Sequence, residues 1–425
     1  MPNGFSTSGL YRPKLLTVLA EGYSVDRLRK DLLAALTVAI VALPLSMAIA
    51  VASGVTPERG LYTAIIGGVL VSMLGGSRFQ IGGPAGAFIV LVAATVTRFG
   101  VEGLLLTVLL SGVMLTVLGF LRIGSLIRFI PHAVTVGFTC GIAVTIAASQ
   151  LKDIAGLKLS GAEPGPFFPK IAALVQAWPS ATPAALVLGF LSALIIFGLR
   201  RLRPTWPGML IAVILASMAS AFFHLPVETI GTKFGGIPHG LEWPRLPAVS
   251  WSLIKEIFPT ALSFTLLGGI ESLLSAKVAD GMTGRVHRSN MELVAQGIAN
   301  IGSALFGGIS VTGTIARTAT NVRAGAQSPV SGIMHSVFLL MFMVFAASLA
   351  SYIPLAALAG VLVVVSWNMI ERDEFAMLLK SWPTAIVLLA TFLLTLVEDL
   401  TVGIIVGCVL AFAFYLISRA RASLT

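Results

Sequence analysis

Charged residues are scarce in this chain. Asp, Glu, Lys and Arg make up 11% of its 425 residues, whereas an ordinary soluble domain is about one-quarter charged. Hydrophobic residues make up 56%, and long apolar runs recur from residue 31 to the C-terminus. Runs of this kind are typical of membrane-spanning helices. The composition excludes an ordinary soluble protein and predicts a polytopic membrane protein.

Cysteines and catalytic motifs are also scarce. Both cysteines, Cys140 and Cys408, lie inside apolar runs, so we expect no disulfide framework. The five histidines lack the spacing of a metal site, and no HExxH, GxSxG or Walker A motif occurs. We therefore expect no enzyme, no metal and no cofactor. The first thirty residues contain no apolar signal-peptide core.

The net charge of +10 does not indicate a nucleic-acid partner. Most basic residues stand in short stretches between apolar runs, which is typical of topology signals in membrane proteins. The partners that we expect are therefore the lipid bilayer and a small solute.

The apolar runs predict an all-α fold of fourteen transmembrane segments. A polar connection with Pro164, Pro166 and Pro169 interrupts the first half, and the longest loop is 223–250. The segments are residues 32–51, 62–74, a half-helix at 84–96, 104–121, 133–148, 184–199, 209–222, 257–276, 293–306, a half-helix around Arg317, 330–349, 354–365, 385–396 and 402–417.

The fourteen segments divide into two sevens, each with a broken third segment. Because seven is odd, the second half must enter the membrane from the opposite side, which makes a 7+7 inverted repeat. The expected parts are an N-terminal segment (1–30), a first repeat (31–222), an extracytoplasmic linker (223–256) and a second repeat (257–420). Lys and Arg are concentrated in the loops that this count places in the cytoplasm, so we predict both termini there.

The two broken segments are GGSRFQIGGPAGAFIV (75–90) and FGGISVTGTIARTATNVRAG (306–325). Non-helical backbone at membrane depth is tolerated only where it is buried in protein or lines a cavity. Two such segments in corresponding positions indicate the binding site of a transporter. The alternative is that Gly and Pro are simply frequent in membrane helices.

Two helix N-termini that meet near the middle of the membrane would form an anion site. Pro84 suits a first helical turn, and Gly82, Gly83 and Gly86 would let a ligand approach the backbone. Arg317 adds a cation at membrane depth, where ionisable residues are functional by default. The alternative is a structural arginine bonded to neighbouring carbonyls.

A single carboxylate, Glu271, lies deep in the eighth segment, in LLGGIESLLSA. It could carry a coupling proton or help to hold a cation. The alternative is a permanent ion pair with Arg317 that only fixes helix positions. The polar stretch that follows, 280–292, is interpreted as a solvated loop with a helix start at Ser289, and with Glu292 in its first turn.

Four stretches together resemble the sulphate permease (SulP) family of anion transporters. They are LTVAIVALPLSMAIAVASGVTPERGLYTAIIGG (36–68), GGSRFQIGGPAGAF (75–88), LGGIESLLSAKVADGMTGRVHRSNMELVAQGIANI (267–301) and the stretch around Arg317. The resemblance covers nearly the whole chain. It implies a fold like that of uracil permease, in which a core domain (segments 1–4 and 8–11) moves against a gate domain (segments 5–7 and 12–14).

The resemblance also implies where the anion binds. It places the anion between the N-termini of segments 3 and 10, facing segments 1 and 8. Carried over by position, the lining residues are Leu45, Ile49, Gly83, Ala85, Gly86, Glu271, Thr314, Ile315, Ala316 and Arg317.

Two departures from the family pattern bear on the function. Many sulphate-type members have Gln after the proline of the first segment, where this chain has Leu45. The sequence stretches IESLLSA and DGMTG instead resemble those of the bacterial C4-dicarboxylate transporter of the family. Members usually end in a cytoplasmic STAS domain, and this chain stops before one could begin. Members are commonly dimers, so the resemblance also implies a homodimer.

From this resemblance we expect a secondary active anion transporter of the bacterial inner membrane. The expected activity is proton-coupled uptake of a C4-dicarboxylate such as succinate or fumarate, with Glu271 in the coupling path. The alternatives are a sulphate or bicarbonate transporter, including a sodium-coupled one, and a passive anion channel.

Overall fold

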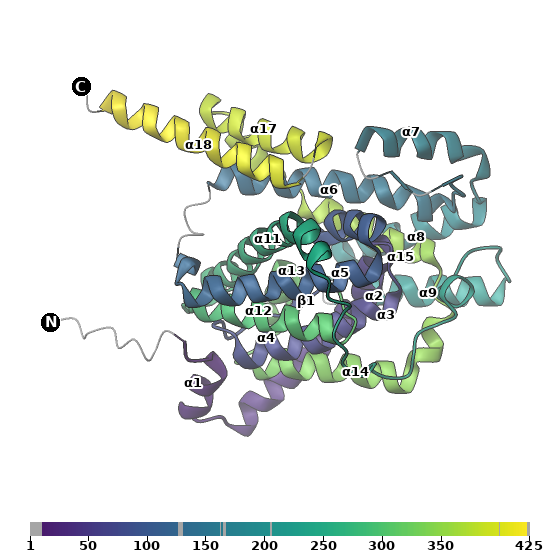
Figure 1. Ribbon diagram of the computed structural model, residues 1–425. Helices are drawn as coiled ribbons and strands as arrows, with labels where there is room; N and C mark the ends of the chain where they lie inside the picture. The colour runs from purple at the N-terminus through teal and green to yellow at the C-terminus, as the bar shows by residue number, and fades with distance from the viewer. Residues whose placement is uncertain are drawn as a thin grey trace.

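The computed structural model describes residues 11–125, 131–161, 163–164, 167–204, 206–398 and 400–422. The first ten residues of the predicted N-terminal segment therefore lie outside the described part. Within the described residues the fold is helical, apart from one two-stranded pairing (Figure 1).

The elements of the first half follow the predicted segments with additions. They are α1 (Lys14–Ala20), α2 (Val25–Ala52), α3 (Pro57–Tyr62), the π-helix η2 (Thr63–Gly67), α4 (Gly68–Leu74), β1 (Gly82–Gly83), the 3-10 helix η3 (Gly86–Phe88), α5 (Ile89–Phe120), η4 (Ile123–Ser125), α6 (His132–Ala155), α7 (Phe167–Ala177), η6 (Trp178–Ser180), α8 (Pro183–Leu202), α9 (Gly208–Phe222) and α10 (Ile230–Phe234).

In the second half a short helix, α13 (Ile315–Arg323), follows the broken segment, where the first half has η3 and the long α5. Its elements are α11 (Trp251–Thr283), α12 (Ser289–Leu305), β2 (Thr312–Gly313), α13 (Ile315–Arg323), α14 (Val330–Ala350), α15 (Leu355–Met369), α16 (Arg372–Leu378), α17 (Trp382–Val397) and α18 (Leu400–Ala422).

Within the described residues, seven helical stretches are long and apolar enough to cross a membrane, and three further apolar helices are shorter. This supports the predicted polytopic helical class. The count of fourteen spans and their 7+7 orientation stay predictions.

The third and fourth predicted segments are joined in α5. Gly100 interrupts this helix with φ 68° and ψ −176°, a conformation that glycine adopts without the steric penalty of a side chain. The helix therefore changes direction at Gly100. The stretch before it follows β1 and η3 as the half-helix, and the stretch after it packs against α11 and α12.

The interpretation of the stretch after α6 as a polar connection is wrong. Residues 167–177 form α7, which packs against α6 and has Pro169 in its first turn, where a missing backbone N–H is tolerated. The Lys170 Nζ donates to Ser149 Oγ of α6 at 2.6 Å. The prolines therefore introduce a helix that lies beside the C-terminal part of α6 (Figure 1).

The helices pack in two groups. One group contains α2, α4, α5 and α11–α14, and the other contains α6, α8, α9, α15, α17 and α18. In Figure 1 the helices α6, α17 and α18 lie together along one side of the first group. Helix α15 and η3 belong to the boundary, since α15 also packs on α2, and η3 contacts α6 and α15. The candidate site lies at this boundary.

Candidate functional site

The two broken segments pair in a sheet of two strands, β1 and β2, of two residues each. Strand β1 pairs antiparallel with β2, with Gly82 opposite Gly313 and Gly83 opposite Thr312. Each strand leads into a helix, η3 and α5 in one case and α13 in the other. Because the strands are antiparallel, these helices leave the sheet in opposite directions, and both helix N-termini lie next to it. Their free N–H groups give this point a partial positive charge.

Side chains from several elements hold the sheet in place. The Ile81 backbone N–H donates to Thr318 Oγ1 at 3.1 Å, and the Thr314 N–H donates to the Ile81 carbonyl at 3.0 Å. Ser272 of α11 lies 2.8 Å from Thr312 through their hydroxyl oxygens, and its Oγ accepts from the Gly313 N–H at 3.2 Å. The strands are thus fixed to α11 and α13 as well as to each other.

The π-helix η2 is hydrogen-bonded to the second broken segment. Thr63 Oγ1 accepts from the Ile309 backbone N–H at 2.7 Å and donates to the Arg59 carbonyl at 2.6 Å. Single π-turns inside α-helices occur frequently at functional sites. Here the wider turn places a threonine where it can receive the backbone of the segment that leads to β2.

Arg317 is buried behind the sheet, with 1% of its surface exposed. Its Nη2 donates to the Pro84 carbonyl at 3.0 Å, while Nε and Nη1 have no partner among the described residues. Nη1 lies directly against Gly83, because a methyl group at Gly83 would overlap it. The structural interpretation of Arg317 thus explains one contact and leaves two donor nitrogens free. Unsatisfied buried donors of a charged group are costly, so an anionic acceptor would fit here.

Glu271 does not pair with Arg317. It has no ion-pair or hydrogen-bond partner among the described residues, and its side chain is partly exposed. Its neighbour Ser272 binds β2 directly, so the carboxylate lies one residue from a contact with the sheet. The alternative of a permanent ion pair is therefore absent from this structure.

The other predicted lining residues divide by exposure. Leu45, Ile49, Ala85 and Thr314 are buried, and Ile315 is 37% exposed. Ala316 is also exposed, and Gly86 is partly exposed. A methyl group on Gly86 would lie 3.6 Å from Met369 Sδ and 3.7 Å from Ile146 Cδ1, so Gly86 faces the second helix group.

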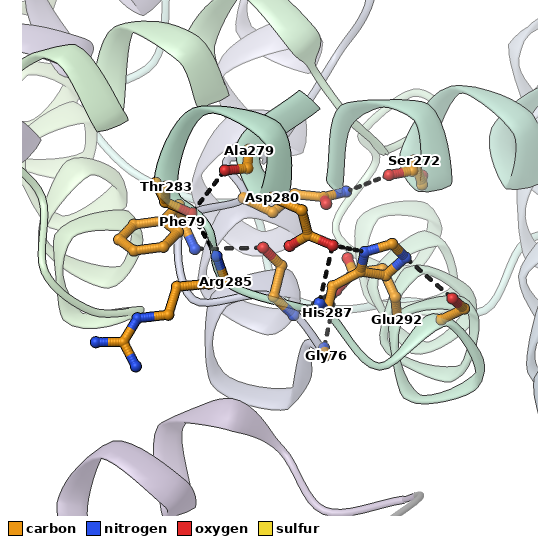
Figure 2. Close-up of polar contacts among 12 residues, drawn as sticks. Gly76, Phe79, Ser272, Ala279, Asp280, Thr283, Arg285, His287 and Glu292 are labelled. Atoms are coloured by element: carbon orange, nitrogen blue, oxygen red, sulfur yellow. Dashed lines mark hydrogen bonds and ion pairs between the residues drawn. The ribbon is translucent and has the colours of Figure 1, made fainter. Parts of the chain in front are cut away.

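The polar stretch 280–292 is exposed at residues 281–282 and 284–286, as expected for a solvated loop, and only its last two residues, Met291 and Glu292, are buried. The His287 Nδ1 lies 2.6 Å from Asp280 Oδ2 (Figure 2). The His287 Nε2 lies 3.0 Å from Ser289 Oγ. Helix α12 does begin at Ser289 with Glu292 in its first turn. Glu292 is however fully buried, and it lies beside Gly76 in Figure 2.

Two buried carboxylates fix the loops next to the half-helices, and the sequence did not reveal either. Glu292 Oε2 accepts from the backbone N–H groups of Gly76 and Ser77 at 2.8 and 3.0 Å. Asp31 Oδ1 accepts from those of Gln327 and Ser328 at 2.6 and 3.1 Å. Each carboxylate belongs to one half of the chain and binds a loop of the other half, so only the folded chain brings these groups together.

Comparisons with known proteins agree with this architecture. The model of the sulfate permease family matches residues 28–392. The chain is 42% identical over 405 residues to the putative sulfate transporter YvdB of Bacillus subtilis (strain 168), covering 95% of this chain and 76% of YvdB. It is 31% identical over 405 residues to the bicarbonate transporter BicA of Picosynechococcus sp. (strain ATCC 27264 / PCC 7002 / PR-6), covering 90% and 69%.

Two solved structures are similar as well. The transmembrane domain of a cyanobacterium bicarbonate transporter BicA has a TM-score of 0.78 at 28% identity, covering 90% of this chain and 98% of that one. The murine anion transporter Slc26a9 in the inward-facing state has a TM-score of 0.88 at 20% identity, covering 98% and 73%, which shows a common fold.

The chain belongs to the sulfate permease family. It is a multi-pass membrane protein and an anion transporter, and it is not an enzyme. The resemblance seen in the sequence is thus confirmed at the level of the family.

Proposed function

We propose that the protein is a secondary active transporter that binds its anion between the N-termini of η3–α5 and α13, with Arg317 as the counter-charge. The observation that carries this proposal is the pair of unpartnered donor nitrogens on a buried guanidinium at the β1–β2 sheet. A buried charge without its full set of partners destabilises the protein unless another group compensates. An anion that binds here would complete the set.

The substrate that we propose is a C4-dicarboxylate. Such an anion has two charged ends separated by an apolar middle. Leu45, Ile49 and Ala85, which are buried and apolar, could contact the middle while Arg317 binds one carboxylate. Glu271, unpaired and partly exposed, is proposed to carry the coupling proton. The two helix groups would move against each other in an elevator-like transport cycle.

Sulphate or bicarbonate is the second candidate substrate. The observation that favours it is the similarity to relatives named as sulfate and bicarbonate transporters. A small inorganic anion needs donors on all sides, and the helix N-termini together with Arg317 offer such donors. The backbone part of the site would serve either class of anion.

Uptake into proteoliposomes tests the proposal. With an inward proton gradient, we expect labelled fumarate to accumulate above its outside concentration, and excess succinate to compete. Competition by sulphate or bicarbonate but not by succinate would replace the proposed substrate by the second candidate. Uptake that stops at equal concentrations would instead indicate a passive channel.

The coupling role of Glu271 is tested in the same assay. We expect Glu271→Gln to retain exchange of internal for external substrate but to lose accumulation driven by the proton gradient, because the variant side chain cannot release a proton. Glu256→Gln, at an exposed position of the same helix, is the matched control. Accumulation at the normal rate in Glu271→Gln would exclude this role.

A further inference from the structure

Two cavities of about 370 Å³ each lie outside the candidate site and share one lining residue. The first lies between the end of α6, the start of α8, residues 225–228 and the start of α15. The second is an apolar groove beside α7, whose walls come from α6, α7 and η6. Leu157, the second residue after α6, lines both. A single elongated molecule could therefore occupy the two.

The carboxylates of the first cavity are already compensated. Asp153 and Glu228 line it, and Lys233 lies between them. The Lys233 Nζ is 3.9 Å from Asp153 Oδ1 and 3.6 Å from Glu228 Oε2. These two carboxylates therefore share one lysine, and they are not free to attract a second cation strongly.

The lysines of the same cavity are compensated less well. Glu163 pairs mainly with Lys170, at 3.0 Å, and only distantly with Lys152, at 4.0 Å. Lys158 also lines the cavity, and no described carboxylate lies within ion-pair distance of it. The lining itself holds two lysines and two carboxylates. Lys233 and Glu163 are paired with its members, and Lys170 is paired with Glu163, so the whole cluster of described residues has four lysines and three carboxylates. One positive charge is left at the cavity, next to Lys152 and Lys158.

Two helix starts add to this positive potential. Thr182, the N-cap of α8, and Leu355, the first residue of α15, both line the first cavity. Neither helix has a side-chain hydrogen bond at its N-cap. The N-terminal ends of helices favour negative charge, so these starts and the two lysines suit the same kind of ligand.

The groove beside α7 indicates that this ligand has an apolar part. Val175 and Trp178 line the groove and are 67% and 54% exposed. In a membrane protein such exposed apolar residues face lipid, and tryptophan favours the level of the lipid headgroups. An anionic group that binds in the first cavity could therefore be the headgroup of a membrane lipid.

We propose that the two cavities form a binding site for one anionic phospholipid. Its phosphate lies near Lys152 and Lys158 in the first cavity, and one acyl chain lies in the groove between α6 and α7. The site is independent of the transport site at Arg317. It would fasten α7 and the ends of α6, α8 and α15 into one unit at the membrane surface.

Native mass spectrometry of the delipidated full-length protein tests this proposal. The probes are phosphatidylglycerol, phosphatidylcholine with the same chains, and glycerol 3-phosphate without chains. We expect phosphatidylglycerol to bind most tightly. Because one lysine near an anionic lipid surface contributes about a fivefold change in affinity, Lys152→Gln and Lys158→Gln should each weaken this binding by about that factor.

Lys255→Gln is the matched control. Lys255 also lies close to an exposed tryptophan, 5.7 Å from the Trp251 ring, but it lines neither cavity. The Lys255→Gln variant should therefore bind phosphatidylglycerol as tightly as the unmodified protein. Equal binding of the two phospholipids, or equal losses in all three variants, would overturn the proposal. Binding of glycerol 3-phosphate as tight as that of phosphatidylglycerol would overturn it as well, because the ligand would then be a free phosphate ester.

Discussion

The two broken segments have the same shape but contribute different chemistry. The first, residues 75–88, brings no charge to the sheet: Gly82 and Gly83 form β1, Pro84 follows them, and the neutral Gln80 side chain lies against Gly313 of β2. The second, residues 306–317, brings a charge, because Arg317 follows its strand. The first segment also supplies the carbonyl, that of Pro84, to which Arg317 donates. The first broken segment thus provides the close contact with Arg317 at Gly83, and the second provides the charged side chain.

Removal of the charge should have the largest effect. We expect Arg317→Ala to abolish saturable uptake, because hydrogen bonds to a charged group contribute about 1.5–3 kcal/mol each, and two such donors are free here. That corresponds to roughly a 10- to 100-fold loss per bond. The measurement is initial uptake against substrate concentration in proteoliposomes.

Arg323→Ala is the control for this variant, because Arg323 lies at the exposed end of the same helix. Its uptake should stay close to that of the unmodified protein. Arg317→Lys should recover part of the activity, since it keeps the charge but not the fork of donors. If Arg317→Ala showed unchanged kinetics, Arg317 would be structural.

A side chain at Gly83, which lies against Arg317 Nη1, should have the second largest effect. A methyl group in Gly83→Ala would overlap Arg317 Nη1, and extra atoms in a packed core cost about 1–3 kcal/mol. We expect the guanidinium to move and the apparent substrate affinity to fall. The matched variant is Gly86→Ala, whose methyl group would have only ordinary contacts, at 3.6 and 3.7 Å. Equal affinities in the two variants would show that the position of the guanidinium does not matter.

Part of this site is visible in the sequence. The lone Arg317 and the Gly-Pro step at residues 83–84 stand out because charges and helix breakers are rare inside apolar runs. Their local pattern is enough to predict two half-helices. The burial of Glu292 is not predictable in this way, because its partners Gly76 and Ser77 are more than two hundred positions away.

The apolar periodicity likewise predicts most of the fold. It locates the long helices, because each must cover the membrane with apolar residues. It does not predict α7, since three prolines and a polar neighbourhood hide a helix that is stabilised by its packing on α6. Tertiary contacts of this kind override the local pattern.

The two buried carboxylates allow a comparison of stability between the repeats. Asp31 accepts from two backbone N–H groups, from the Ser328 hydroxyl and from Tyr23 Oη, whereas Glu292 accepts from two backbone N–H groups and from Gln296 Nε2. We expect Asp31→Asn to lower the melting temperature at least as much as Glu292→Gln. Each should cost about 1–3 kcal/mol, the usual range for buried donors left unsatisfied.

Thermal unfolding in detergent checks this order. Glu256→Gln, at an exposed position of α11, serves as the control and should melt like the unmodified protein. A larger loss in Glu292→Gln than in Asp31→Asn would mean that the number of accepted hydrogen bonds does not decide the contribution.

The smallest effect is expected where α1 contacts the first broken segment. Arg78 donates to both carboxylate oxygens of Glu21, and this hydrogen bonding lowers the pKa of Glu21 below its ordinary value of 4.5. A carboxylate with a lowered pKa in the folded state stabilises the fold above its ordinary pKa, and this stabilisation is lost as the pH falls below 4.5 and the group becomes protonated.

The second broken segment has no such contact among the described residues, because Arg317 is paired only with a carbonyl. We therefore expect Glu21→Gln to lower the melting temperature slightly at pH 7 and not at all in strong acid, where both proteins lack the charge. A difference that persisted unchanged in acid would show that the contact acts through packing and not through charge. Glu21 is partly exposed while Arg78 is buried, and salt screens buried charges less than exposed ones, so 1 M salt should reduce the difference at pH 7 without removing it.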